Sequence, residues 1–158
     1  MNIDDFARMF PEKMDDLNAF LQGDKIKEIM GDEAVNFYKQ SFNNEGFTDK
    51  TLEKWPEVER RKPGSSWYKK GANADRKILS GPLKQLQDSL TFEYIPNGVK
   101  IKSPMIYAGV HQFGEPANVF GKKPFTMKAR PFIGKSEVMM QNINSEIETE
   151  IKTIISKK

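Results

Sequence analysis

The sequence contains no cysteine and a single histidine, His111. The absence of cysteine excludes disulfides, thiolate metal sites and cysteine nucleophiles. A zinc site built on one histidine would need carboxylates at ligand spacing around it, and no such cluster is visible in the sequence. We therefore predict a protein that uses no metal and no other cofactor.

The sequence also has no long apolar run. No stretch approaches the roughly 18 residues that a transmembrane helix needs, and the mean hydropathy is −0.65. The opening residues, MNIDDFARMF, are acidic where a secretory signal is basic. These features predict a protein that is made and kept in a cytoplasm, with no membrane partner. The formal charge of +3 permits contact with nucleic acid but does not argue for it.

Three stretches have the spacing of apolar residues that is typical of amphipathic helices. They are an N-terminal segment at residues 1–22, a helix at residues 24–43 and a C-terminal helix at residues 136–156. Between the second and third, residues 44–82 mix Gly, Pro, Ser and charge, which predicts a long irregular loop. The length of the chain suits a single domain over residues 1–158.

The region after the loop has signals for strands and turns. Residues 86–103 alternate apolar and polar side chains around Asn97-Gly98, the strongest short signal for a hairpin. A short helix is expected at residues 107–112, and a further strand at residues 125–127. The predicted fold class is α+β, with an antiparallel β-sheet packed against the helix at 24–43 and the C-terminal helix.

His111 lies in the segment YAGVHQFG and raises the question of catalysis. A general base or an activated nucleophile needs a partner, and no Ser, Asp or Glu stands in a nucleophile-elbow setting. We interpret His111 as structural, hydrogen-bonded to backbone or to a tyrosine hydroxyl. Tyr107 and Phe113 would complete a packed corner in which Gly114 permits the turn. The protein is predicted not to be an enzyme, and the alternative is a hydrolase centred on His111.

Basic side chains gather in two places, beside aromatic rings that can stack on bases. The slight net charge favours an ordinary solvated loop as the explanation for them, and no helix-turn-helix or other reading motif accompanies them. The candidate contacts to DNA or to a protein partner are Arg60, Arg61, Lys62, Lys69, Lys70, Lys122 and Lys123.

Four segments, in this order, resemble the phage virion morphogenesis (tail completion) proteins of Mu-like phages and prophages. They are FNNEGF followed by Trp55, RKILSGPLKQLQDSL, VKIKSPMIYAGVHQFG and MKARPFIGKS, and the resemblance covers about residues 24–156. One departure is Pro82 followed by three additional residues, Lys84 to Leu86, which can displace the start of the hairpin. The residues that carry the resemblance are Glu45, Gly46, Trp55, Leu79, Gly81, Leu83, Ser89, Tyr107, Ala108, His111, Gln112, Phe113, Gly114, Arg130, Pro131 and Phe132.

The resemblance implies a structural protein of the virion, present in the host bacterial cytoplasm during assembly and related to head–tail joining proteins. It implies tail completion or head–tail joining, through a homo-oligomeric ring that docks on other tail or connector proteins. Residues 115–130 are our candidate for an arm between subunits. The alternative is a nucleic-acid-binding accessory protein that uses the loop at 60–77 and the segment at 122–130. Non-specific contact with DNA passing through the ring is compatible with either function.

Overall fold

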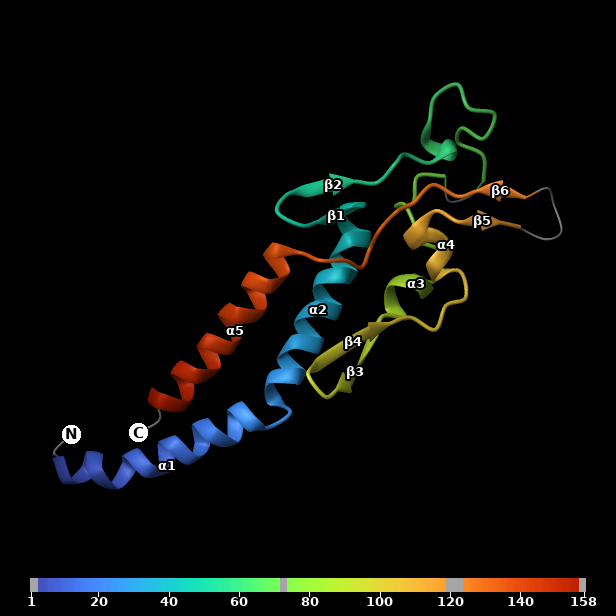
Figure 1. The fold of residues 1–158 in the computed structure, drawn as a ribbon. Coiled ribbons are helices and arrows are strands. Elements are labelled where there is room, and N and C mark those ends of the chain that lie inside the picture. The colour runs from blue at the N-terminus through green and yellow to red at the C-terminus, as the bar shows by residue number, and fades with distance from the viewer. Residues whose placement is uncertain (1–2, 72–73, 119–123, 157–158) are drawn as a thin grey trace.

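Three helices form the scaffold of the molecule. The computed structural model describes residues 3–71, 74–118 and 124–156. Helices α1 (Ile3–Gln22), α2 (Lys25–Asn44) and α5 (Glu137–Ser156) have 20 residues each. Figure 1 shows α2 and α5 side by side, with α1 crossing their lower ends at one extremity of an elongated molecule. The helices predicted at 24–43 and 136–156 therefore appear within one residue of their expected bounds.

Helix α2 is the central element because its apolar face meets both α5 and the hairpin that precedes α4. Ala34, Tyr38 and Phe42 follow one another at four-residue spacing and are almost fully buried. A larger cluster around them includes Trp55, Leu90, Phe132 and Ile143. A second, smaller cluster joins Phe20 of α1 to Ile29 and Ile154, which attaches α1 to the ends of α2 and α5.

The strands form three separate two-stranded antiparallel ribbons rather than one sheet. They are β1 (Gly46–Thr48) with β2 (Leu52–Lys54), β3 (Thr91–Ile95) with β4 (Gly98–Lys102), and β5 (Pro116–Ala117) with β6 (Phe125–Thr126). An isolated hairpin is at best marginally stable in water. Here β1 and the β3–β4 ribbon pack on α2, so the helix provides the surface that further strands would otherwise supply. The α+β fold class is confirmed, with this difference in the strands.

The segment predicted as an irregular loop, residues 44–82, is only partly irregular. It contains the β1–β2 ribbon and a 3₁₀ turn, η1 (Glu59–Arg61). All three residues of β2 are exposed, so their side chains lack the alternation that marks a strand. The β3–β4 hairpin begins at Thr91 rather than near residue 86, because the short helix α3 (Gln85–Asp88) occupies the additional residues.

The predicted short helix before Gly114 is α4 (Ala108–Phe113). It ends at Gly114, whose φ of 74° is left-handed and whose N–H bonds to the carbonyl of Val110. A Cβ at this position would lie 2.7 Å from the backbone nitrogen of Ala129. Glycine is therefore required both by its conformation and by the close approach of a second segment.

We predict that Gly31→Ala destabilises the protein. A Cβ added at Gly31 would collide with the ring of Phe92, and overpacking of this kind costs about 1–3 kcal/mol. That cost exceeds the gain of about 1 kcal/mol from replacing glycine by alanine in a helix. Urea unfolding followed by circular dichroism measures the change in the free energy of unfolding.

Gly81→Ala is the matched control, since nothing lies within 4 Å of a Cβ added there. We expect its stability to equal or slightly exceed that of the wild type. Equal stability of Gly31→Ala and the wild type would show that the Phe92 ring moves aside at no cost, and would contradict the prediction.

Candidate functional site

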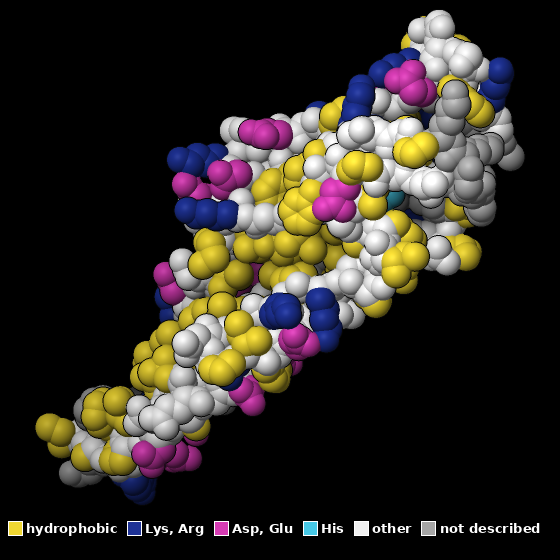
Figure 2. Space-filling model, turned by 45° about the vertical axis from the view of Figure 1, so that its right-hand side comes forward, with side chains coloured by type: hydrophobic (Ala, Val, Ile, Leu, Met, Phe, Trp, Pro, Cys, Tyr) yellow, Lys and Arg dark blue, Asp and Glu magenta, His cyan; other side chains and the backbone are white. Residues whose placement is uncertain are grey.

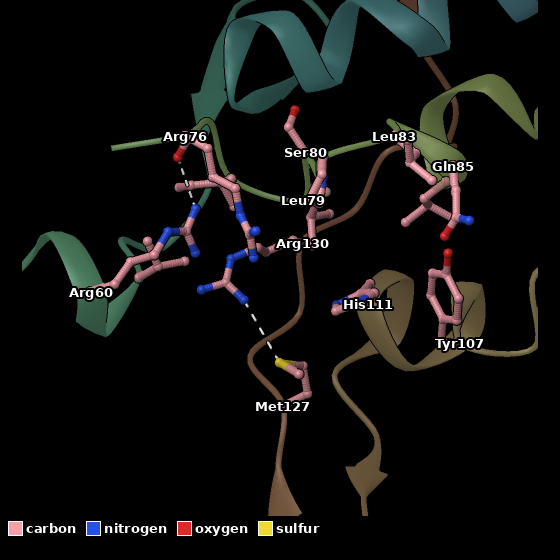
Figure 3. Close-up of a pocket in the computed structure, with 15 residues that line it drawn as sticks. Arg60, Arg76, Leu79, Ser80, Leu83, Gln85, Tyr107, His111, Met127 and Arg130 are labelled. Carbon is pink, nitrogen blue, oxygen red and sulfur yellow. Dashed lines mark hydrogen bonds between the residues drawn. The ribbon is translucent and has the colours of Figure 1, made fainter. Parts of the chain in front are cut away.

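A pocket with a volume of about 460 Å³ lies toward the end of the molecule opposite α1. Its walls come from η1, the segment at residues 76–86, helix α4 and the residues that follow β6 (Figure 3). Its lining residues are Val58, Arg60, Arg76, Ile78, Leu79, Ser80, Gly81, Pro82, Leu83, Gln85, Leu86, Tyr107, His111, Met127 and Arg130. The sequence separates these residues by up to 72 positions, so no local motif marks the pocket.

Two arginines of the pocket are held in place by backbone carbonyls. Arg60 donates from Nε to Ala74 at 3.1 Å and from Nη2 to Arg76 at 2.8 Å. Arg130 donates from Nε and Nη2 to the carbonyl of Pro56, and only 5% of its surface is exposed. These bonds orient the guanidinium groups but do not neutralise them. Burial accordingly lowers the pKa of both arginines, which nevertheless stay charged.

No carboxylate lines this pocket among the described residues. Arg60, Arg76 and Arg130 likewise make no ion pair with any described residue. Arg61, next in the chain, differs sharply because its guanidinium pairs with both Glu45 and Glu57. The pocket thus gathers three arginines with no carboxylate on its wall, although Glu57, outside the lining residues, interacts electrostatically with Arg60 and Arg130.

His111 lies on the wall of the same pocket. Its ring stands edge-on to Tyr107, with centroids 6.0 Å apart. Its buried Nδ1 has no hydrogen-bond partner, so the predicted hydrogen bond to backbone or tyrosine is wrong for this atom. Burial lowers the pKa of His111, and the positive charge of Arg130 lowers it further. The imidazole is therefore neutral at pH 7, and no carboxylate among the lining residues orients it for acid–base chemistry.

Gln112, the neighbour of His111, joins two of the segments that carry the family resemblance. Its Oε1 accepts hydrogen bonds from the backbone nitrogens of Phe132 (3.0 Å) and Ile133 (3.1 Å). Its Nε2 donates to the carbonyl of Ile133 at 2.6 Å. The carbonyl of His111 accepts a further bond from Arg130 N at 2.7 Å. The segment YAGVHQFG therefore fixes the backbone of ARPF, which explains why the two occur together.

Glu45 holds the loop at residues 44–82 in place, as Gln112 holds the ARPF segment. Its carboxylate accepts from Arg61 Nη1 at 2.6 Å and Nη2 at 3.1 Å, and from the backbone N of Ile78 at 2.7 Å. The hydrogen bonds from Arg61 lower the pKa of Glu45. The guanidinium of Arg61 is consequently paired with carboxylates of its own chain, and its contact with DNA stays a prediction.

The remaining residues of the resemblance divide between core and surface. Trp55 donates from Nε1 to the carbonyl of Pro131 at 2.7 Å, and Phe132 is 1% exposed. Gly46 has no room for a side chain against β2, Ser89 shares a hydrogen bond with Ser103, and Ala108 packs against the core. In contrast, Leu83 and Phe113 are 73% and 69% exposed. The packed corner is therefore wrong for Phe113, whose ring faces solvent.

Among the other candidate contacts, Lys62 pairs with Glu59, and Lys69 and Lys70 are exposed. Lys122 and Lys123 lie outside the described residues. The candidate list also missed Ser136, whose Oγ accepts the N–H of Met139 at the start of α5, and Asp49, which accepts the N–H of Glu137. Serine ahead of an apolar helix is an N-cap signal, so Ser136 was recognisable. Asp49 lies 88 residues away and was not.

The described residues contain no group of three or more His, Asp or Glu side chains placed to hold a metal ion. None of their helices is long and apolar enough to cross a lipid bilayer.

The fold and the site define an α+β protein in which most of the motif residues hold segments together. Residues 30–152 match the phage virion morphogenesis family, and because this match covers most of the chain, the chain belongs to that family. Membership indicates a structural role in building the virion and association with it. Helix α1 lies outside the matched residues. No curated protein and no solved structure shows a significant match to the chain.

We predict that Gln112→Ala lowers the free energy of unfolding by about 2–3 kcal/mol, because two backbone N–H groups lose their acceptor. Gln141→Ala, an exposed site on α5, is the control and should change stability little. Chemical denaturation compares the two variants with the wild type. A Gln112→Ala protein as stable as the control would mean that water replaces the three bonds.

We also predict that Glu45→Gln removes part of the pH dependence of stability. The pKa of Glu45 is lowered in the folded state, so its stabilising contribution is present above the ordinary value of 4.5 and is lost as the pH falls through the folded pKa. The variant should be less stable than the wild type near neutral pH, and the difference should shrink in acid. Glu59→Gln, which removes an exposed pair with Lys62, serves as the control and should show little difference at either pH.

Proposed function

We propose that this protein acts in tail completion or head–tail joining. It would assemble in the host cytoplasm into a homo-oligomeric ring, dock on other tail or connector proteins and catalyse no reaction. Family membership supports a structural role in morphogenesis. The observation that carries the finer proposal is the presence of exposed apolar side chains at both ends of an elongated molecule.

The two sets of exposed apolar residues are far apart. Ile3, Leu21 and Ile155 lie at the end formed by α1 and α5, and they are 81%, 50% and 53% exposed. Leu83, Ile106 and Phe113 lie toward the other end. Figure 2 shows hydrophobic side chains on the surface toward both ends of one face and in a band between them. Different surfaces at opposite ends are what a ring with heterologous contacts uses.

The β5–β6 ribbon supports an arm between subunits in this proposal. The ribbon projects from the body of the molecule beyond α4 (Figure 1). Phe125, at its described outer part, is 43% exposed. A short ribbon with an exposed aromatic side chain can bury that side chain against a neighbouring subunit of the assembly. Aromatic anchors of this kind contribute strongly to binding.

Deletion of the gene from its phage or prophage tests the proposal. We expect the deletion to leave heads and tails unjoined, or tails unfinished, when lysates are examined by electron microscopy. Purified protein added to such a lysate should restore complete particles, and mass spectrometry should find several copies of the chain in each particle. Complete infectious particles in the absence of the protein would overturn it.

The nucleic-acid alternative rests on exposed Lys69 and Lys70 beside Tyr68. Tight binding to duplex DNA at physiological salt, with a steep loss of affinity as salt rises, would favour this alternative. The double variant Lys69→Gln/Lys70→Gln should then bind more weakly and with a smaller salt slope.

A further inference from the structure

The pocket described above has three arginines on one side, with no carboxylate among its lining residues, and apolar walls elsewhere. Figure 3 shows the guanidinium groups of Arg60, Arg76 and Arg130 gathered on one side, with His111 and Tyr107 across from them. The side chain of Arg76 makes no hydrogen bond or ion pair with any described residue, so its donors are available. A guanidinium presents several N–H donors in a fixed plane that suits a carboxylate. The pocket therefore fits an anionic group carried on an apolar body.

The character of the walls favours a protein carboxylate over a DNA phosphate. Ile78, Leu79, Pro82 and Met127 contribute apolar surface, and Arg130 is only 5% exposed. Phosphates of a duplex reach cations on an open surface, because the double helix cannot enter a cavity. A side chain on a helix can enter one. At about 460 Å³, the cavity has room for side chains but not for a whole helix.

Helix α1 carries the complementary charge. It has five acidic and two basic residues, a net charge of −3. Glu12, Asp15 and Asp16 are exposed, lie three and four residues apart on one face, and make no ion pair among the described residues. Like charges at this spacing destabilise a helix. We call Glu12, Asp15 and Asp16 the acidic face of α1. A cationic partner would relieve the repulsion among their carboxylates and stabilise the helix.

The acidic face cannot fold back onto the pocket of its own chain. The last turns of α1 are fixed by the burial of Phe20 against Ile29 and Ile154, and Lys13 donates to the carbonyl of Ile155 at 2.7 Å. These contacts hold α1 at one extremity of the molecule, while the pocket lies toward the other (Figure 1). Any contact between the two must therefore join different copies of the chain.

We propose that the arginine pocket receives carboxylates from the acidic face of α1 in a second copy of this protein. The contact is head-to-tail and uses a different surface on each partner, so it repeats around a ring. The proposal rests on the proposed ring assembly and names its interface. Helix α1 lies outside the residues matched by the family, so the contact is argued from the residues of this chain alone.

A labelled peptide of residues 1–22 tests the contact in trans. We expect saturable binding to the full-length protein by fluorescence anisotropy, with affinity falling as salt rises because the attraction is screened. Arg76→Glu in the protein, and Glu12→Gln/Asp15→Asn/Asp16→Asn in the peptide, should each weaken binding by about tenfold or more. Lys135→Glu is the control, since it makes the same charge change at an exposed site outside the pocket and should leave affinity nearly unchanged.

Full-length chains provide the second test. Arg76→Glu abolishes one half of the contact and Glu12→Gln/Asp15→Asn/Asp16→Asn the other, so neither variant should self-associate through it. A mixture of the two variants should form a dimer, because one wild-type pocket then meets one wild-type acidic face. Light scattering after size-exclusion chromatography measures the masses. A contact of α1 with α1 would give no such rescue.

Several outcomes would overturn the inference. The first is peptide binding whose affinity does not change with Arg76→Glu, and the second is a mixture of the two variants that stays monomeric. The third is displacement of the labelled peptide by a duplex oligonucleotide but not by unlabelled peptide. If Arg76→Glu protein still forms rings and restores particles, this interface is wrong and the proposed function stands. If particles are complete without the protein, the proposed function is wrong whatever the peptide binds.

Discussion

The interlocking of Phe42, Trp55 and Phe132 is the constraint on which the rest of the structure depends. Phe42 is fully buried at the end of α2, and its ring centre lies 5.7 Å from that of Trp55 and 5.2 Å from that of Phe132. Trp55 adds a hydrogen bond to Pro131, beside Phe132. These rings come from three segments that are far apart in the chain. Their burial, with aromatic pairs worth roughly 0.5–1.5 kcal/mol beyond area alone, places the loop and the ARPF segment against α2.

The arginines near this aromatic cluster differ in whether they pair with a carboxylate. Arg61 pairs with both Glu45 and Glu57 and ties the start of the loop to its middle. Arg76 and Arg130, in contrast, face a cavity that has no acidic side chain among its described lining residues. Removing a partner from a satisfied pair costs stability, whereas an unsatisfied cluster lowers the cost of binding an anion from outside. The first arrangement belongs to folding, and the second supports recognition.

The helices and the main hairpin were predictable from the sequence because their signals are local. Apolar spacing identified α2 and α5, Asn97-Gly98 identified the β3–β4 turn, and Gly114 identified the end of α4. The β1–β2 ribbon was missed since three-residue strands with exposed side chains leave no periodic pattern. The pocket was missed for a different reason. Arg60, Arg76 and Arg130 meet only through tertiary folding, and nothing in their neighbouring residues shows that Arg61 is paired while they are not.

The uneven distribution of acidic and basic side chains along the molecule has a consequence for how copies meet. Helices α1 and α5 each carry a net charge of −3, whereas residues 57–84, around the pocket, carry eight basic and three acidic side chains. Negative charge thus predominates on α1 and α5 and positive charge around the pocket. In the proposed assembly, this separation of charge would favour head-to-tail orientation of two approaching copies in dilute salt and raise the fraction of productive encounters. A protein with the same net charge spread evenly over its surface would have to find that orientation by rotational diffusion alone.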